Sequence, residues 1–221
     1  MYRACIFDLD GTLTNTLDSL TYSVNAAMRE LGMPEITREQ CRLFVGNGSR
    51  VLLEKTLAAG GDEKLEKLPA AMEAYGRIFD ENCTYRVTPY EGVPQMIEEL
   101  KLKGLRLAVL SNKPDRQAVH VVEEIFGKGK FDLIRGQREG VPRKPDPTAA
   151  LAIASALGVT PGETLYIGDS EVDAVTGKAA GMRTVLVSWG FRSMDVLKAA
   201  GVKDIVDSAR DIVRIAEGEK E

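Results

Sequence analysis

The sequence predicts an α/β protein with a Rossmann-like parallel sheet core and an inserted all-helical domain. Apolar runs of strand length alternate with stretches of helical spacing, which is typical of βαβ units in a parallel sheet. The main apolar runs also end in polar or acidic residues. One stretch, 15–85, has helical periodicity without a convincing strand. We therefore expect the α/β core to comprise 1–14 and 86–221, with the helical domain at 15–85.

The first apolar run ends in two acids. Residues 4–7 are short and apolar, which favours a core strand. Asp8 and Asp10 follow, and because residues i and i+2 of an extended chain point the same way, both carboxylates face one place. Two anions there repel each other unless a proton, a cation or a basic side chain intervenes. Gly11 allows a sharp turn, and Thr12 adds a hydroxyl beside the acids.

The inserted stretch is expected to form four helices. Apolar residues recur at helical spacing over 17–31, 51–57 and 65–79, and Pro69 interrupts or restarts the last of these. Residues 37–40 have the pattern of a capping box, which predicts a helix start there. Short polar stretches flank the insert and would serve as hinges.

The rest of the core continues the alternation of strands and helices. The expected strands lie at 105–110, 131–134, 164–167 and 183–187, with a short edge strand at 204–206. The expected helices lie at 93–103, from after 112 to 127, from 147 to 157, at 172–181 and at 208–216. Asp146 is expected to cap the third of these helices, with proline at its first position.

Polar residues follow the second and third long strands, and one lysine lies between them in the chain. These residues are Ser111 and Asn112, Lys144 before Pro145, and Asp169 with Asp173. Each has a simpler explanation when taken alone, as a helix cap, a solvated lysine or an exposed acid. Ligands of parallel sheets bind outside the carboxyl ends of the strands, where all of these residues are expected. Their coincidence at one sheet edge favours a catalytic site.

These motifs resemble those of the haloacid dehalogenase superfamily of phosphatases. The motifs in order are Asp8-x-Asp10-Gly11-Thr12, Ser111-Asn112, Lys144-Pro145 and Gly168-Asp169-Ser170-x-x-Asp173. Two further segments, Val45-Gly46-Asn47-Gly48 and Ser111-Asn112-Lys113-Pro114, are similar to the phosphoglycolate phosphatase branch. The resemblance covers nearly the whole chain and implies that the inserted helices form a cap over the active site.

The resemblance implies a role for each motif. Asp8 would be the nucleophile that forms an aspartyl-phosphate, and Asp10 would be the general acid and base. Thr12 and Lys144 complete the expected catalytic group. Ser111, Asn112 and Lys144 would bind the phosphoryl oxygens.

The implied cofactor is Mg²⁺, which prefers hard oxygen ligands. Asp8 and Asp169 would bind it through carboxylates, and Asp10 through its backbone carbonyl. Asp173 would orient either the metal or Lys144 from one helical turn further along.

The loop between two helices of the insert is the expected specificity element. It contains Gly46, Asn47, Gly48 and Arg50. Arg50 would pair with a substrate carboxylate, because a guanidinium binds a planar anion with two parallel hydrogen bonds. A flexible turn with a solvated arginine is an equally good interpretation of these residues.

Composition narrows the function class. The 221 residues are 44% apolar and 28% charged, with a net charge of −4, so no basic surface for nucleic acid is expected. No apolar stretch is long enough for a membrane span, and a cytoplasmic protein is expected. Cys5, Cys41 and Cys83 do not form a disulfide framework or a zinc site. With His120 as the single histidine, carboxylates are the expected acid–base groups.

The sequence therefore predicts a Mg²⁺-dependent hydrolase of a small phosphorylated metabolite. The expected substrate is an anionic phosphomonoester similar to 2-phosphoglycolate, cleaved through an aspartyl-phosphate. The alternatives are a mutase similar to β-phosphoglucomutase and an inorganic pyrophosphatase of the same fold. A binding protein without turnover is disfavoured because Asp8, Asp10, Lys144 and Asp169 are all present. The sequence leaves the oligomeric state, monomer or dimer, open.

Overall fold

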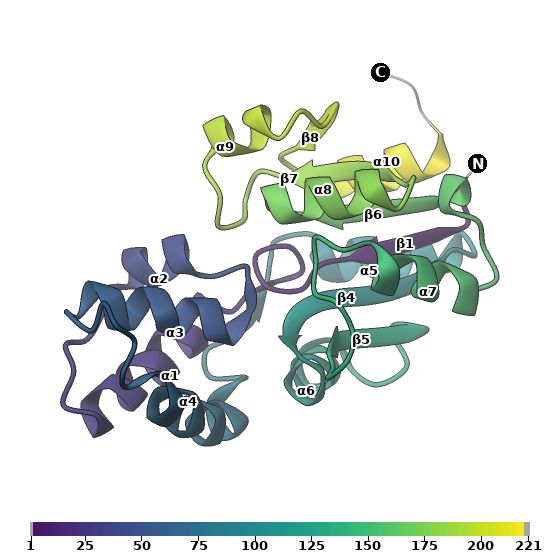
Figure 1. The fold of residues 1–221 in the computed structure, drawn as a ribbon. Coiled ribbons are helices and arrows are strands. Elements are labelled where there is room, and N and C mark those ends of the chain that lie inside the picture. The colour runs from purple at the N-terminus through teal and green to yellow at the C-terminus, as the bar shows by residue number, and fades with distance from the viewer. Residues whose placement is uncertain (1, 219–221) are drawn as a thin grey trace. The chain divides into compact units, whose positions relative to one another are not determined.

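The structure is a computed structural model that describes residues 2–218 (Figure 1). The chain divides into two compact units. The first, here called the sheet unit, comprises Met1–Asn15 and Pro89–Glu221, and the second, the helical unit, comprises Thr16–Thr88. The α/β class predicted from the sequence is confirmed by the parallel sheet of the first unit.

The sheet unit is built on a six-stranded parallel sheet with the order β5-β4-β1-β6-β7-β8. Its strands are β1 (Ala4–Phe7), β4 (Arg106–Pro114), β5 (Leu133–Gln137), β6 (Thr164–Gly168), β7 (Arg183–Val187) and β8 (Asp204–Val206). The chain proceeds outward from β1 to β4 and β5, then returns to the other side of β1 for β6, β7 and β8. The strand order therefore reverses beside β1, and ligands of open α/β sheets bind at such a reversal.

Helices cover the sheet and complete its core (Figure 1). They are α5 (Val93–Leu102), α6 (Asp115–Phe126), α7 (Thr148–Ala156), α8 (Glu171–Ala179), α9 (Met194–Ala199) and α10 (Ala209–Glu217), with a 3₁₀ turn at Pro161–Glu163. Ala150 and Ile153 of α7 are buried against Ile6 of β1 and Tyr166 of β6. This packing supports the central strand, whose carboxyl end carries the two N-terminal acids.

The structure moves several expected boundaries. β4 runs on to Pro114, with an irregular register after Leu110, so the polar residues 111–113 belong to the strand instead of following it. β5 begins at Leu133, two residues later than expected, and extends further. The short helix α9 has no counterpart among the expected elements, because its six residues are too few for a periodic pattern.

Helix α7 begins one residue later than the sequence suggested. Asp146 accepts a hydrogen bond from the Thr148 amide (2.9 Å), and the helix starts at Thr148 with Pro147 as its N-cap. The prediction of Asp146 as N-cap and Pro147 as the first helical residue is therefore wrong by one position: Asp146 lies before the N-cap, although its carboxylate still accepts from the first helical amide.

The helical unit contains α1 (Leu17–Glu30), α2 (Arg38–Phe44), α3 (Gly48–Ala59) and α4 (Leu68–Asn82). The capping box is confirmed: the Gln40 amide donates to Thr37 Oγ1 (3.1 Å), and the Thr37 amide donates to Gln40 Oε1 (2.9 Å). Pro69 lies in the first turn of α4, where a missing amide hydrogen costs nothing, so it starts the helix instead of breaking it. β2 (Thr14–Asn15) and β3 (Thr88–Pro89) form a separate two-stranded sheet.

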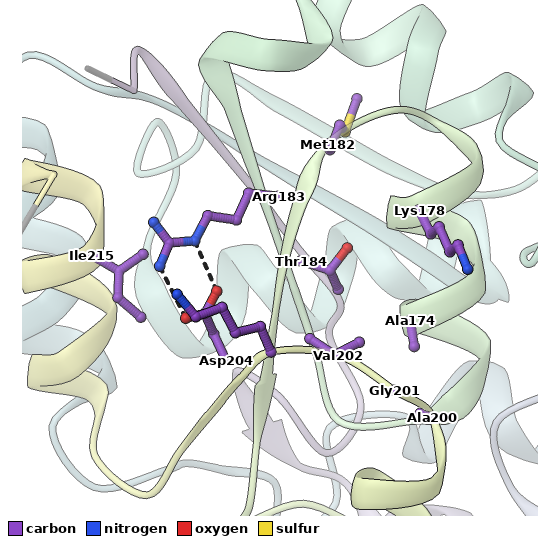
Figure 2. A pocket seen from close by; sticks show the side chains of 11 residues that line it. Ala174, Lys178, Met182, Arg183, Thr184, Ala200, Gly201, Val202, Asp204 and Ile215 are labelled. Atoms are coloured by element: carbon purple, nitrogen blue, oxygen red, sulfur yellow. Dashed lines mark hydrogen bonds and ion pairs between the residues drawn. The ribbon is translucent and has the colours of Figure 1, made fainter. Parts of the chain in front are cut away.

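A hollow of about 600 Å³ lies at the start of β7 and β8 (Figure 2). Arg183 and Asp204 are the first residues of these strands and form a bidentate ion pair there. The distance from Arg183 Nε to Asp204 Oδ2 is 2.8 Å, and that from Nη2 to Oδ1 is 2.9 Å. This is the amino-terminal edge of the sheet, opposite the edge where the polar motifs lie. The hollow contains none of the candidate site residues.

Two further observations concern the chain as a whole. All three cysteines are buried and free of disulfide bonds. Within residues 2–218, no helix has both the length and the apolar character needed to cross a lipid bilayer.

Two helical glycines give opposite predictions for substitution by alanine. A Cβ on Gly177 of α8 would lie 2.1 Å from Thr184 Oγ1, whereas a Cβ on Gly76 of α4 would meet no atom within 4 Å. We expect Gly76→Ala to raise the free energy of unfolding by roughly 0.5–1 kcal/mol through helix propensity. Gly177→Ala should lower it by roughly 1–3 kcal/mol through overpacking. Urea denaturation of both variants measures the difference.

The double variant Gly177→Ala/Thr184→Ala provides the control. Removing the threonine hydroxyl and methyl group should relieve the contact, so the added cost of Gly177→Ala should shrink in this background. An equal cost in both backgrounds would contradict the proposed clash.

Candidate active site

The candidate site lies at the carboxyl end of the central strands of the sheet unit. Asp8 directly follows β1, and its amide continues the ladder by donating to the Ile167 carbonyl of β6 (2.8 Å). On the other side of β1, Phe7 is paired with Val109 of β4. Since neighbouring parallel strands end at the same edge, the polar residues of β1, β4 and β6 are brought together there.

Both protein groups that contact the Asp8 carboxylate do so at the same oxygen. The Leu9 amide donates to Oδ1 at 2.7 Å, and Lys144 Nζ lies 2.9 Å from the same oxygen. Among the described residues, no contact is recorded for Oδ2, which leaves this oxygen for a ligand or a reaction. Burial raises the pKa of Asp8 to about 7, with Lys144 opposing the shift and the charges of Asp173 and Asp10 adding to it.

Lys144 bridges Asp8 and Asp173. Its Nζ lies 2.8 Å from Asp173 Oδ1, and the ammonium group is buried. Burial alone would lower the pKa of Lys144, but the two carboxylates outweigh it and hold this pKa well above its usual value. The lysine therefore stays charged and fixes the position of both acids.

Asp173 is fully engaged by neighbouring side chains. Besides Lys144, its Oδ1 accepts from the Tyr166 hydroxyl (3.4 Å), and its Oδ2 accepts from the Ser170 hydroxyl (2.6 Å). Asp173 is the third residue of α8 and has no exposed surface. Of the two expected roles, orientation of Lys144 is the one that these contacts support.

Asn112 holds the backbone of Lys144. Its Nδ2 donates to the Lys144 carbonyl (3.1 Å), and its Oδ1 accepts from the Lys144 amide (3.0 Å). The sequence suggested only a contact with the phosphoryl group for Asn112. The structure adds these two hydrogen bonds to the Lys144 backbone, which help to place the lysine beside Asp8.

Ser111 and Lys113 lie on the extension of β4. The Ser111 hydroxyl accepts from the Lys113 amide (3.2 Å), which leaves its own O–H as a donor. Lys113 Nζ donates to Asp10 Oδ1 at 2.8 Å, and the lysine side chain is almost fully buried. Sequence reasoning assigned no role to Lys113. The signal was its position two residues after Ser111, because side chains at i and i+2 of a strand share a face.

Asp169 follows β6 and is held by the connection after β7. Its Oδ2 accepts from the Phe191 amide (2.7 Å). Burial raises the pKa of Asp169 well above its usual value, and the charges of Asp173 and Asp8 add to this, while the Phe191 amide and Arg192 oppose it. Among the described residues no contact is recorded for Oδ1, so Asp169, like Asp8, offers one oxygen.

Thr12 contributes a buried hydroxyl to the loop after β1. Within residues 2–218, its Oγ1 has no hydrogen-bond partner. An unpaired buried hydroxyl is costly in a folded protein, so a bound group that accepts or donates a hydrogen bond there would stabilise it.

The carboxylates fit a divalent cation. Asp8, Asp169 and Asp173 each offer an oxygen, and these atoms lie within 4.8 Å of one another. Together with Asp10, they place four carboxylates against the ammonium groups of two lysines, so the fully ionised cluster has a net charge of −2. Because Asp173 is engaged elsewhere, Asp8 and Asp169 are the two acids that would each offer one oxygen to such a cation. One or two carboxylates with the remaining positions left to water or phosphate are typical of Mg²⁺.

The expected specificity residues belong to the helical unit. Gly46 and Asn47 lie between α2 and α3, Gly48 is the first residue of α3, and Arg50 lies in its first turn. Arg50 Nε donates to Glu54 Oε1 (2.8 Å) within the same helix. This contact uses the Nε–H of Arg50, and a guanidinium carries further N–H donors on its two terminal nitrogens.

Comparison with known proteins agrees with this site. Residues 5–187 match the family described as haloacid dehalogenase-like hydrolase. The chain belongs to this family. A phosphoglycolate phosphatase of Aquifex aeolicus is 34% identical over 189 residues, covering 86% of each chain. A phosphoglycolate phosphatase of Cereibacter sphaeroides is 34% identical over 212 residues, covering 95% of this chain and 96% of the relative.

A solved structure extends the likeness to the whole fold. A protein from Lactobacillus delbrueckii subsp. bulgaricus, provisionally assigned as a phosphoglycolate phosphatase, has a TM-score of 0.92 at 32% identity. The match covers 99% of both chains. The predicted family and the hydrolase class are thereby confirmed, and these similarities indicate a phosphatase.

The buried bridge gives a stability prediction. Lys144→Met keeps the length of the side chain but leaves Asp8 and Asp173 buried without their cation. We expect a loss of roughly 3–5 kcal/mol in the free energy of unfolding at pH 8 without divalent metal, measured by urea denaturation. The double variant Lys144→Met/Asp173→Asn, with one charge fewer, should recover part of the loss. A single variant as stable as the wild type would show that the bridge is not a stabilising constraint.

Proposed function

We propose that this protein is a Mg²⁺-dependent phosphatase that hydrolyses a small anionic phosphomonoester through an aspartyl-phosphate on Asp8. The observation that carries the proposal is the arrangement of Asp8, which bonds to Lys144 through Oδ1 while its Oδ2 has no protein partner among the described residues. Asp10 lies two residues further along the same loop, and its charge acts on Asp8. Asp169 offers an oxygen within 4.8 Å of one of Asp8, and Ser111 lies on β4, the strand paired with β1.

Charge balance is the main requirement for this reaction. A phosphoryl group presents three charged oxygens, and a carboxylate attacks it only when the repulsion is offset. Lys144 offsets part of it beside Asp8. Mg²⁺, held by Asp8 and Asp169 and by the Asp10 carbonyl that the family resemblance implies, would supply the remaining positive charge and polarise the phosphoryl oxygens.

In the first step, an oxygen of Asp8 forms a bond to phosphorus as the bond to the leaving oxygen breaks. Asp10 donates its proton to that leaving oxygen. Lys113, at 2.8 Å from Asp10 Oδ1, holds the carboxyl group in position for this transfer. The Ser111 hydroxyl and the Lys144 ammonium group bind the phosphoryl oxygens during the step.

In the second step, water attacks the phosphorus of the aspartyl-phosphate. Asp10, now ionised, takes a proton from this water, and the phosphorus–oxygen bond to Asp8 breaks. Inorganic phosphate leaves, and Asp8 and Asp10 return to their starting states. The same acid thus serves first as proton donor and then as proton acceptor.

The proposed substrate is 2-phosphoglycolate or a similarly small phosphorylated acid. Support comes from the relatives named as phosphoglycolate phosphatases, two of which are 34% identical to this chain. The helical unit would act as a cap, and its loop with Asn47 and Arg50 would contribute to substrate choice. The protein is expected to act in the cytoplasm without nucleic-acid or membrane partners.

Phosphate release from a substrate panel tests this function. The panel contains 2-phosphoglycolate, pyrophosphate, β-glucose 1-phosphate and a nucleoside monophosphate, each with and without Mg²⁺. We expect Mg²⁺-dependent release with a preference for 2-phosphoglycolate. Asp8→Asn should lower kcat by at least about 10³-fold, because the amide is not a nucleophile.

The other outcomes are distinct. Comparable weak release from all substrates, still dependent on Asp8, would keep the mechanism and exclude the proposed substrate. Phosphate release that survives in Asp8→Asn would exclude the mechanism. The variant Arg50→Gln tests the cap loop when it is assayed with 2-phosphoglycolate and with the nucleotide. If Arg50 binds the substrate carboxylate, its removal should raise KM for the phosphorylated acid and leave KM for the nucleotide unchanged.

Mg²⁺ binding should weaken as pH falls. The pKa of Asp8 is raised to about 7 in the metal-free protein, so protons compete with the cation below this pH. With one proton displaced, we expect the apparent Mg²⁺ affinity to be about tenfold lower at pH 6 than at pH 8, as measured by calorimetry.

The same shift makes the stability of the metal-free protein dependent on pH. Because the pKa of Asp8 is higher in the folded state than in the unfolded state, this group stabilises the protein fully below about pH 4. That contribution disappears as pH rises through about 7. Mg²⁺ should therefore raise Tm more at pH 8 than at pH 6. Equal Mg²⁺ effects at both pH values would contradict the titration of Asp8.

A further inference from the structure

The connection between β7 and α9 contacts the loop that carries the two N-terminal acids. Trp189 Nε1 donates a hydrogen bond to the Thr12 carbonyl at 3.1 Å. Thr12 lies two residues after Asp10, and the turn around it is tied to the Leu9 carbonyl by the amides of residues 12–14. The indole therefore holds the far side of the turn that begins at Asp8.

The same connection also contacts the loop after β6. The Phe191 amide donates to Asp169 Oδ2 at 2.7 Å, and Arg192 Nε forms an ion pair with Glu171 at 2.9 Å. The segment 189–192 thus binds one acidic loop through an indole and the other through a backbone amide and a guanidinium. The segment therefore contacts both loops.

Two glycines allow these segments to pack in direct contact. A Cβ on Gly190 would lie 2.3 Å from Asp169 Cβ and 2.6 Å from the Gly11 carbonyl oxygen. A Cβ on Gly11, whose φ is +91°, would lie 2.3 Å from Asp169 Oδ2. Because no space separates them, a displacement of one segment must displace the others.

We propose that Trp189 is a positioning residue for the cation site. Its bond to the Thr12 carbonyl holds the loop of Asp8 at the separation from Asp169 that a bound divalent cation requires. The proposal rests on the proposed function in one respect, the assignment of Asp8 and Asp169 as the acids that bind Mg²⁺. The charge distribution explains the need for such a device. The acids of the two loops repel each other before the cation binds. A site that already holds them together spends less of the binding free energy on bringing the acids into position.

Trp189 also provides a spectroscopic signal, because it is the only tryptophan in the chain. A divalent charge bound beside its loop changes the electric field at the indole. We expect Mg²⁺ to change the tryptophan emission of the wild type, with a midpoint equal to the Kd from calorimetry. This readout needs no substrate and no turnover.

The decisive variant is Trp189→Phe, which keeps an aromatic ring and removes the N–H donor. We expect its Mg²⁺ affinity, measured by calorimetry, to fall about fivefold, the effect of one lost hydrogen bond. Activity lost at low Mg²⁺ should be recovered at high Mg²⁺. An unchanged Mg²⁺ affinity in a folded Trp189→Phe protein would overturn the proposal.

Leu197→Ala is the matched control. Leu197 of α9 is buried with Ala174 and Leu186 in an apolar cluster whose described members include none of the candidate site residues, so its truncation should destabilise the sheet unit without removing a group of the site. We expect a lower Tm and an unchanged Mg²⁺ affinity. If both variants lost Mg²⁺ affinity in proportion to their loss of stability, Trp189 would be a structural residue only.

If Trp189→Phe does not fold, the emission titration of the wild type tests the positioning role of Trp189 by itself. Saturation with Mg²⁺, established by calorimetry, without any change in emission would then overturn the proposal. Failure of the proposed function is distinguishable from this. A wild type that binds Mg²⁺ with the expected emission change but releases no phosphate would retain the positioning role and lose the phosphatase assignment.

Discussion

A single buried ammonium group is the constraint on which the candidate site depends. Lys144 lies between Asp8 and Asp173, at 2.9 and 2.8 Å from their oxygens, in a region where water does not screen the charges. The surrounding contacts support this bridge: Asn112 holds the lysine backbone, and Ser170 holds the far oxygen of Asp173. The position of Asp8 is therefore set by neutralisation of charge as much as by the strand that precedes it.

Two lysines divide the acids into groups with different surroundings. Lys144 pairs with Asp8 and Asp173, whereas Lys113 pairs with Asp10. The side chains of Asp8 and Asp10 are similarly exposed, at 12% and 14%, so the lysine partner and not solvent access distinguishes these two acids. Asp169 stands apart from both lysines and is fixed by the Phe191 amide, so it remains the acid with the least compensation from lysine.

The elements that could be predicted are those with a strong local pattern. Asp8 and Asp10 end an apolar run, and Thr37 with Gln40 forms a capping box, so both signals lie within a few residues. Contacts between distant segments were not accessible in this way. The pairing of Asn112 with the Lys144 backbone joins residues 32 positions apart, and the bond from Trp189 to Thr12 joins residues 177 apart. The role of Lys113 was missed because β4 was expected to end at 110, which hid the shared face of 111 and 113.

The central position of β1 affects how the protein is made on the ribosome. β1 is synthesised first, yet its two partners begin only at Arg106 and Thr164. At typical elongation rates of about 5–20 residues per second, about 8 to 30 seconds pass before β6 can pair with it. The helical unit, a continuous segment from Thr16 to Thr88, has all of its contacts available much earlier. The nascent chain thus holds an apolar strand unpaired while its insertion folds, and this interval is when the polypeptide is most exposed to aggregation and to chaperones.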